Sequence, residues 1–109
     1  NYLNADLVEA GKQNGPEGEA LLTPLLTPFV GKLDALVLGC THYPFAETVI
    51  RKILGPDTAL LDGGEGTAAQ TMQLLKHADL LYDGPGTVEF ENSAEDPAML
   101  ELSEKLAQL

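Results

Sequence analysis

One cysteine and a nearby histidine are the residues of this chain best suited to acid–base chemistry. Cys40 follows an apolar run, and His42 lies two positions further on, within a stretch that reads GCTHYP. A thiolate can take up a proton, and an imidazole can donate or accept one near neutral pH. Each residue alone has a plainer interpretation, because such a cysteine is usually a small buried hydrophobe and such a histidine usually lies at the surface or caps a helix.

The neighbouring segments predict where this pair would lie. Residues 33–38 form an apolar run that predicts a buried strand, and residues 45–54 place four apolar side chains on one face of a predicted helix. In open α/β sheets the ligand crevice lies beyond the C-terminal ends of the strands. We therefore expect Cys40 on the turn between strand and helix, where amides and the dipole of the helix start would favour the thiolate.

Helical and strand-like patterns alternate along the rest of the chain. Pro24 and Pro28 are expected to limit or distort the first helix, and Gly55 begins a turn that ends the second. Asp96 and Pro97 are expected to start the last helix, as a cap and a first helical residue. The predicted order is helix 19–26, strand 33–38, helix 45–54, strand 58–61, helix 66–75, strand 87–90 and a final helix. This alternation predicts an α/β fold with a parallel sheet flanked by helices.

Composition excludes several functions. The chain has 109 residues, enough for one modest domain, and its 6 basic against 17 acidic residues give a formal charge of -11. Such a charge repels nucleic acid and anionic membranes. There is no apolar stretch of the roughly 18 residues that cross a bilayer, and one cysteine cannot form an internal disulfide. We expect a cytoplasmic protein, and the initial Asn indicates a chain that was processed, cloned as a piece or cut from a longer one.

The GCTHYP stretch closely resembles the second catalytic-cysteine motif of the glutamate racemases, in the aspartate/glutamate racemase family. The resemblance spans roughly Leu7 to Leu109 and is specific around Cys40. It implies a two-lobed α/β fold in which the chain returns to its first lobe near its end. Residues 1–62 would then complete the second lobe, which carries the Cys40 motif, and residues 63–109 would return to the first lobe.

The same resemblance implies chemistry without a cofactor. Two thiols flank the α-carbon of an amino acid, one removing a proton and the other returning one to the opposite face. Cys40 would be the second thiol, and the remainder of a parent chain would supply the first, because its motif is not in this sequence. His42 would act in catalysis and, with Thr41, in substrate binding. Glu9 would assist the opposite thiol. The plainer alternatives are a helix-capping role for Thr41 and a solvated carboxylate for Glu9.

The implied function is interconversion of L- and D-glutamate, supplying D-glutamate for peptidoglycan. The implied partners are the small amino-acid substrate and, since the family is commonly dimeric, a second copy in a homodimer. The alternatives are an aspartate or other amino-acid racemase of the same family, and a non-catalytic α/β binding domain.

Two other patterns have weaker functional interpretations. Residues 62–67 read DGGEGT and are glycine-rich before a predicted helix, but the lysine of a phosphate-binding loop is missing, so a strand-to-helix turn is the better explanation. His77 is distant from Cys40 and His42 in sequence, and the three lack the paired spacing of zinc ligands. We therefore predict no metal site and a structural role for His77.

Overall fold

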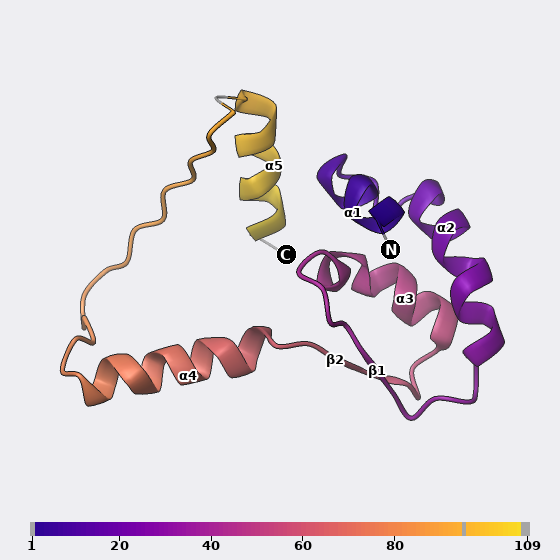
Figure 1. Ribbon diagram of the computed structural model, residues 1–109, viewed down its shortest axis with the longest axis horizontal. Helices are drawn as coiled ribbons and strands as arrows, with labels where there is room; N and C mark the ends of the chain where they lie inside the picture. The colour runs from indigo at the N-terminus through magenta and orange to yellow at the C-terminus, as the bar shows by residue number, and fades with distance from the viewer. Residues whose placement is uncertain (1, 95, 108–109) are drawn as a thin grey trace.

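The computed structural model describes residues 2–94 and 96–107. Helices flank a small parallel sheet, which confirms the predicted α/β class (Figure 1). The elements, with η marking short 3-10 helices, are α1 (Tyr2–Glu9), α2 (Pro16–Leu26), η1 (Thr27–Phe29), β1 (Ala35–Val37), η2 (Tyr43–Ala46), α3 (Glu47–Leu54), β2 (Ala59–Leu61), α4 (Gly64–His77) and α5 (Pro97–Ala107). No helix within the described residues is long and apolar enough to cross a membrane.

The sheet consists of β1 and β2, which pair in parallel with Leu36 opposite Leu60. These two central leucines are partly buried against the core, whereas their neighbours in both strands are exposed on the other face. Both strands are shorter than predicted, although the ladder continues through a bond from the Leu38 amide to the Leu61 carbonyl (2.7 Å). A strand without polar residues on either face is typical of a parallel sheet that is covered on both sides.

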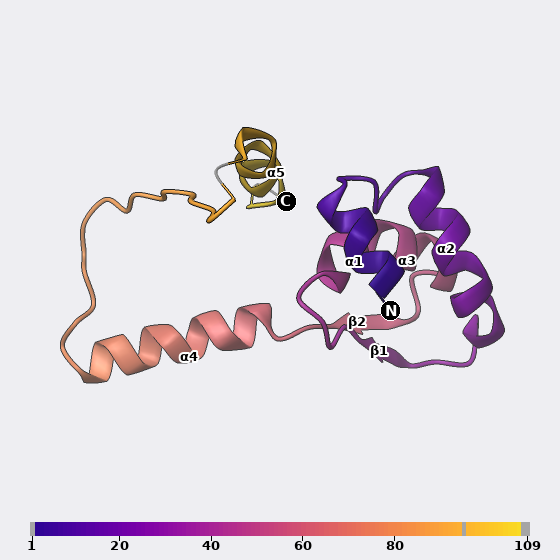
Figure 2. The same ribbon diagram turned by 45° about the horizontal axis from the view of Figure 1, so that its top comes forward.

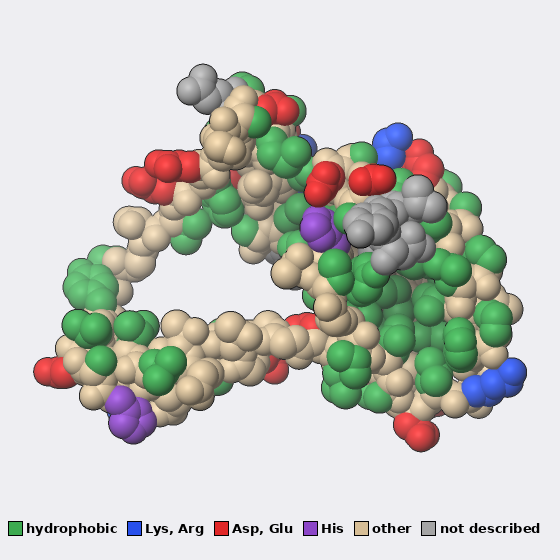
Figure 3. Space-filling model, viewed as in Figure 1, with side chains coloured by type: hydrophobic (Ala, Val, Ile, Leu, Met, Phe, Trp, Pro, Cys, Tyr) green, Lys and Arg blue, Asp and Glu red, His purple; other side chains and the backbone are tan. Residues whose placement is uncertain are grey.

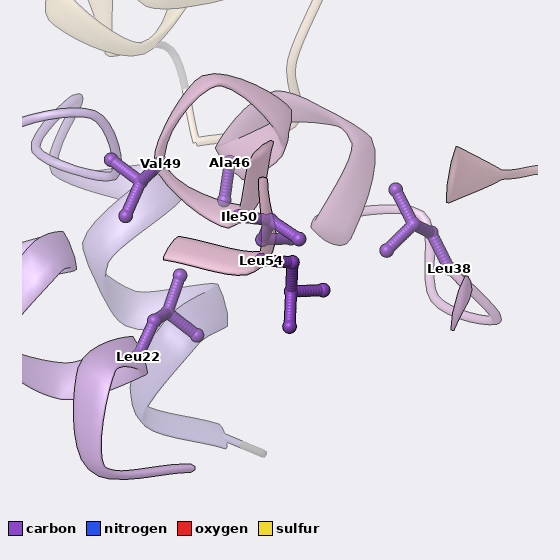
Figure 4. Packing of buried hydrophobic residues seen from close by; sticks show 6 residues of the cluster. All are labelled: Leu22, Leu38, Ala46, Val49, Ile50 and Leu54. Carbon is purple, nitrogen blue, oxygen red and sulfur yellow. The ribbon is translucent and has the colours of Figure 1, made fainter. Parts of the chain in front are cut away.

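The core lies between α2, α3 and the sheet. The apolar face predicted for residues 45–54 is confirmed, because α3 turns its apolar residues inward and its charged residues to solvent. Figure 4 shows the six buried residues of this cluster, Leu22, Leu38, Ala46, Val49, Ile50 and Leu54. The core thus anchors both the strand before Cys40 and the helix after it.

The starts of two helices differ from the prediction. α2 begins earlier, with Pro16 at its first turn, and Pro24 lies inside the helix without ending it. The predicted helix 45–54 begins as the 3-10 turn η2, and its α-helical part starts only at Glu47. Gly55 ends α3 as predicted, with a φ of 87° that suits glycine.

Two elements were not predicted correctly. The strand expected over residues 87–90 is wrong, because that segment forms no regular element. A strand needs a neighbour for its ladder of hydrogen bonds, and the described residues place none beside it. Conversely, α1 forms over residues for which no helix was predicted.

α4 projects from the rest of the molecule, whereas α5 returns to it. We call residues 2–61 the body, and α4 with residues 78–92 the arm. Figures 1 and 2 show the arm leading away from the body and α5 lying back beside α1 and η2. The Ala98 amide donates to the Asp96 side chain (2.9 Å), which confirms the predicted start of this last helix. In Figure 3, open space separates the arm from the body and α5.

Candidate functional site

Cys40 lies on the turn between β1 and η2, beyond the C-terminal end of its strand, as predicted. The Tyr43 amide donates to the Cys40 carbonyl (3.2 Å), and the Phe45 amide donates to the His42 carbonyl (3.3 Å). These bonds wind the chain tightly from the cysteine into η2. The thiol is partly buried rather than enclosed in the core. The turn therefore presents a sulfur atom at the surface of a rigid strand-to-helix connection.

His42 lies beside that sulfur. Cys40 Sγ and His42 Nδ1 are 3.8 Å apart. The pKa of the Cys40 thiol is lowered, first by a hydrogen bond from the His42 backbone amide and then by the imidazole, while partial burial opposes the change. The amide that lowers this pKa belongs to His42, directly before the 3-10 turn η2 and ahead of α3. These contacts therefore make the thiol easier to ionise than an ordinary cysteine, despite the acidic composition of the chain.

Glu9, at the end of α1, holds the other nitrogen of the ring. Its Oε1 lies 3.3 Å from His42 Nε2. The pKa of His42 is raised, chiefly by the hydrogen bond with Cys40 and further by Glu9, against a lowering by burial. When the neutral ring donates Nε2–H to the carboxylate, Nδ1 is left as an acceptor facing the thiol. The three side chains thus form a relay in which a proton can pass from sulfur to nitrogen.

Within this chain the observed partner of Glu9 is His42, on the side of Cys40. The resemblance implied that Glu9 assists the opposite thiol, which lies outside this chain, so that role stays a prediction. The Glu9 side chain is also 59% exposed, so the plainer alternative of a solvated carboxylate stands beside this contact. Thr41 Oγ1 lies 3.4 Å from His42 Nδ1, and neither η2 nor α3 has a side-chain cap, so the helix-capping alternative for Thr41 is not observed.

An open hollow of about 760 Å³ lies next to Cys40. Cys40 and Thr41 line it on one side, and Asp62, Gly63 and Thr67 line it on the side of α4. The Gly64 amide donates to Asp62 Oδ1 (2.6 Å), so this glycine-rich stretch is the predicted strand-to-helix turn. Because the Asp62 carboxylate already accepts the hydrogen bond of that amide, the turn is poorly suited to binding phosphate. The hollow is large enough for a small amino acid beside the thiol.

A second, smaller hollow of about 150 Å³ lies next to His42. Glu9, Thr41 and His42 line it together with residues of α5, namely Met99, Leu102, Ser103 and Leu106. Sequence reasoning missed the part played by α5, because a row of apolar residues at helical spacing carries no chemical motif. That spacing was the only signal, and it does not say what the helix covers.

His77 takes no part in this site. Its Nδ1 lies 2.8 Å from the Gln73 carbonyl in the last turn of α4, which agrees with a structural role. Within residues 2–94 and 96–107, no group of three or more histidine, cysteine or acidic side chains could hold a metal ion.

The structure is that of an α/β protein in which a thiol contacts an imidazole and the imidazole contacts a carboxylate, with an open hollow beside the thiol. No family model matches the chain. Its sequence is 35% identical over 107 residues to a glutamate racemase of Clostridium perfringens, covering 95% of this chain and 41% of that protein. Glutamate racemases of Clostridium kluyveri (40% identity, 93% of this chain and 40% of that protein) and Deinococcus radiodurans (43%, 86% and 33%) are also similar.

The resemblance to glutamate racemases seen in the GCTHYP stretch is thereby confirmed over nearly the whole chain. This chain is a sequence relative of the glutamate racemases. It spans about two fifths of the length of the first two relatives.

Proposed function

We propose that this chain is the C-terminal portion of a cofactor-independent glutamate racemase, with Cys40 as one of two thiols that exchange the α-proton. The observation that carries the proposal is the position of Cys40, whose sulfur lies 3.8 Å from His42 Nδ1 and lines an open hollow. A thiol whose pKa is lowered by an adjacent histidine, beside an open hollow, suits acid–base catalysis better than a purely binding role. The similarity to glutamate racemases supports the reaction and favours glutamate over aspartate as the substrate.

The proposed chemistry balances with one proton on each side. The Cys40 thiolate removes the α-proton from one face of the substrate and becomes a thiol, leaving a carbanion stabilised by the adjacent carboxyl group. A thiol across the cleft donates its proton to the opposite face and becomes the thiolate. In the reverse direction, Cys40 donates and the other sulfur accepts. Between turnovers His42 takes the proton from Cys40 Sγ at Nδ1, and Glu9 stabilises the imidazolium. His42 then gives that proton to solvent water while the opposite thiolate takes one up from solvent, so the starting protonation states return.

Thr41 is proposed to bind the substrate, together with His42. Thr41 lines both hollows, and its hydroxyl oxygen lies 3.4 Å from His42 Nδ1. A carboxylate of the substrate placed there would be close to the sulfur, which is what proton removal from the α-carbon requires.

The second thiol must come from residues outside this chain, which has only one cysteine. We propose that residues 1–62 belong to one lobe and that residues 63–109 return toward the other. The arm supports this division for residues 64–92, because its helix α4 has no buried residues and its leucines are exposed. In contrast, α5 lies beside Glu9 and His42 of the body. The remainder of a longer chain would cover these side chains and bring the first thiol to the cleft.

The proposed setting follows from the same reaction. D-glutamate is a building block of peptidoglycan, so the enzyme would work in the cytoplasm, where the precursors are made, and as a homodimer if it shares the assembly common in its family. An aspartate racemase would need the same thiol, so the assay below includes both amino acids.

The test is solvent exchange in the full-length protein. In deuterated water, the wild-type protein should exchange the α-proton of L-glutamate and form D-glutamate. Cys40→Ser should reduce both by several orders of magnitude, because a hydroxyl is a much weaker acid and its anion is not available near neutral pH. Near-normal rates in this variant would remove Cys40 from the mechanism. Exchange with aspartate alone would refute glutamate as the substrate. If the wild-type protein exchanged no amino acid at all, a binding domain would be favoured.

The 109-residue chain by itself should show no turnover. It offers one thiol to one face of the α-carbon, so a proton removed there can return only to the same face. Racemisation by the isolated chain would contradict the two-thiol proposal.

A further inference from the structure

The loop between α1 and α2, residues 10–15, is fixed by its own backbone bonds. Three backbone amides donate to carbonyl oxygens: that of Gly11 to Val8 (2.9 Å), that of Lys12 to Leu7 (2.8 Å) and that of Gly15 to Lys12 (3.1 Å). Gly11 has a φ of 68°, which other residues rarely adopt. The loop therefore continues rigidly from the helix that carries Glu9.

α2 holds the same loop from the other side. A Cβ on Gly18 would come within 1.9 Å of the Gln13 carbonyl oxygen, so helix and loop lie in direct backbone contact. Gln13 is buried, and so is Val8 in the preceding helix. A loop packed in this way cannot shift without moving α1 and α2. The backbone atoms from which its side chains extend are therefore held in place.

Asn14 projects from this loop to the turn that carries the thiol. Its Nδ2 donates to the Phe45 carbonyl (2.9 Å), across 31 positions of sequence. Phe45 lies in η2, whose amides bond back to the Cys40 and His42 carbonyls. Glu9 contacts His42 from the same rigid unit. The turn is thus attached twice, once through the His42 side chain and once through the Phe45 backbone.

We propose that Asn14 is a positioning residue for the Cys40 thiol. It touches neither the sulfur nor the proposed substrate and acts through the backbone of η2. By holding the Phe45 carbonyl, Asn14 keeps the turn wound so that the His42 amide points at Sγ and the imidazole stays between Glu9 and the thiol. Its effect on the thiol is independent of the reaction, whereas its effect on racemisation rests on the proposed function.

Two variants test the proposal. Asn14→Ala removes the donor and its volume, and Asn14→Leu removes the donor at similar volume. In the full-length protein, the rate of alkylation by iodoacetamide is followed against pH on the peptide containing Cys40, by mass spectrometry. Both variants should alkylate about three- to tenfold more slowly at neutral pH, with the midpoint of the pH profile moved to higher pH, because the thiolate loses its aligned amide. The pH profile of kcat/KM should move in the same direction.

Lys52→Met is the matched control. Lys52 Nζ contacts Glu19 (2.7 Å) and also joins two elements across the body, but it holds α2 to α3 and not the turn. This variant should leave the alkylation profile unchanged, even where it lowers the melting temperature as much as the Asn14 variants do. A merely structural role for Asn14 predicts equal behaviour of all three variants.

The outcomes separate the two proposals. Unchanged alkylation in both Asn14 variants would overturn the positioning role, whatever Cys40→Ser does to racemisation. A slowed, shifted alkylation in both variants supports the role even if Cys40→Ser stays active, in which case only the racemase proposal falls. A shift in Asn14→Ala alone would assign the effect to lost volume and overturn the role of the donor.

Discussion

The body and the arm contain apolar residues at similar helical spacing, yet they use them differently. In the body, α3 buries Val49, Ile50 and Leu54 against α2 and the sheet. In the arm, the leucines of α4 and of the segment after it are exposed, for example Leu74 at 61% and Leu80 at 69%. The radius of gyration is 16.9 Å, where a compact chain of this length would have about 13 Å. The arm therefore accounts for the extended shape.

This difference teaches what a periodic pattern can establish. Helical spacing produces a helix with an apolar face in both regions, but burial depends on a partner that the pattern does not name. The body finds its partner within residues 2–61. The arm does not, and the proposed remainder of the chain would supply it.

Ile50→Ala should have the largest effect on stability and would test the body side of the comparison. Ile50 is 4% exposed, so the variant leaves a cavity and should lower the free energy of unfolding by about 2–5 kcal/mol. The matched variant in the arm, Leu74→Ala, should cost no more than about 0.5 kcal/mol in the 109-residue chain. Urea denaturation measures both.

Leu74→Ala in the longer protein sharpens the same comparison. If the remainder of the chain covers the arm, this variant should cost more there than in the 109-residue chain. Equal, small costs in both proteins would show that the arm stays uncovered and would count against the proposed two-lobed arrangement.

The site could be predicted from sequence where its determinants are local. An apolar run followed by Gly39 placed Cys40 beyond a strand, and Asp96 before Pro97 marked the start of α5, which the Asp96 cap confirms. The extended pattern at residues 87–90 was equally local but wrong, because a strand also needs a neighbour.

What could not be predicted is the set of contacts between distant segments. The bond from Asn14 to Phe45 and the return of α5 to the side of His42 join residues many positions apart. The contact of Glu9 with His42 is of the same kind, since the resemblance linked Glu9 to the opposite thiol and did not indicate His42. Such contacts follow from packing, which no motif encodes.

Glu9→Gln tests whether the chemistry belongs to the body. Loss of the carboxylate should lower the pKa of His42, which in turn should raise the pKa of the Cys40 thiol, because the imidazolium that favours the thiolate is less stable. Racemisation at neutral pH should fall about tenfold, with the onset of activity moved to higher pH. Rates across pH and an NMR titration of His42 measure this. Glu65→Gln, at the start of α4, is the control and should change neither the racemisation rates nor the titration of His42.

Thr58→Val should have a smaller effect. Thr58 is 2% exposed, and its hydroxyl donates to the Leu33 carbonyl (3.2 Å) at the start of the sheet. Valine keeps the shape but leaves that carbonyl without this donor, at a cost of about 1 kcal/mol in urea denaturation. Thr71→Val, which removes an exposed bond to the Thr67 carbonyl within α4, should cost less. The reverse order would mean that the arm is the better-packed region.

Glu101→Gln should have the smallest effect, although its partner Lys105 is only 2.7 Å away in α5. Lys105 lowers the pKa of the Glu101 carboxyl, so the pair stabilises the folded state above the ordinary pKa of a glutamate, and this contribution is lost as pH falls through the lowered value. At neutral pH the pair is fully charged, but both side chains are about two-thirds exposed, and water and salt screen their attraction. The melting temperature should therefore stay the same within error. A clear drop that persists at high salt would show that α5 depends on this pair, rather than on Leu102 and its apolar neighbours, to stay beside the body.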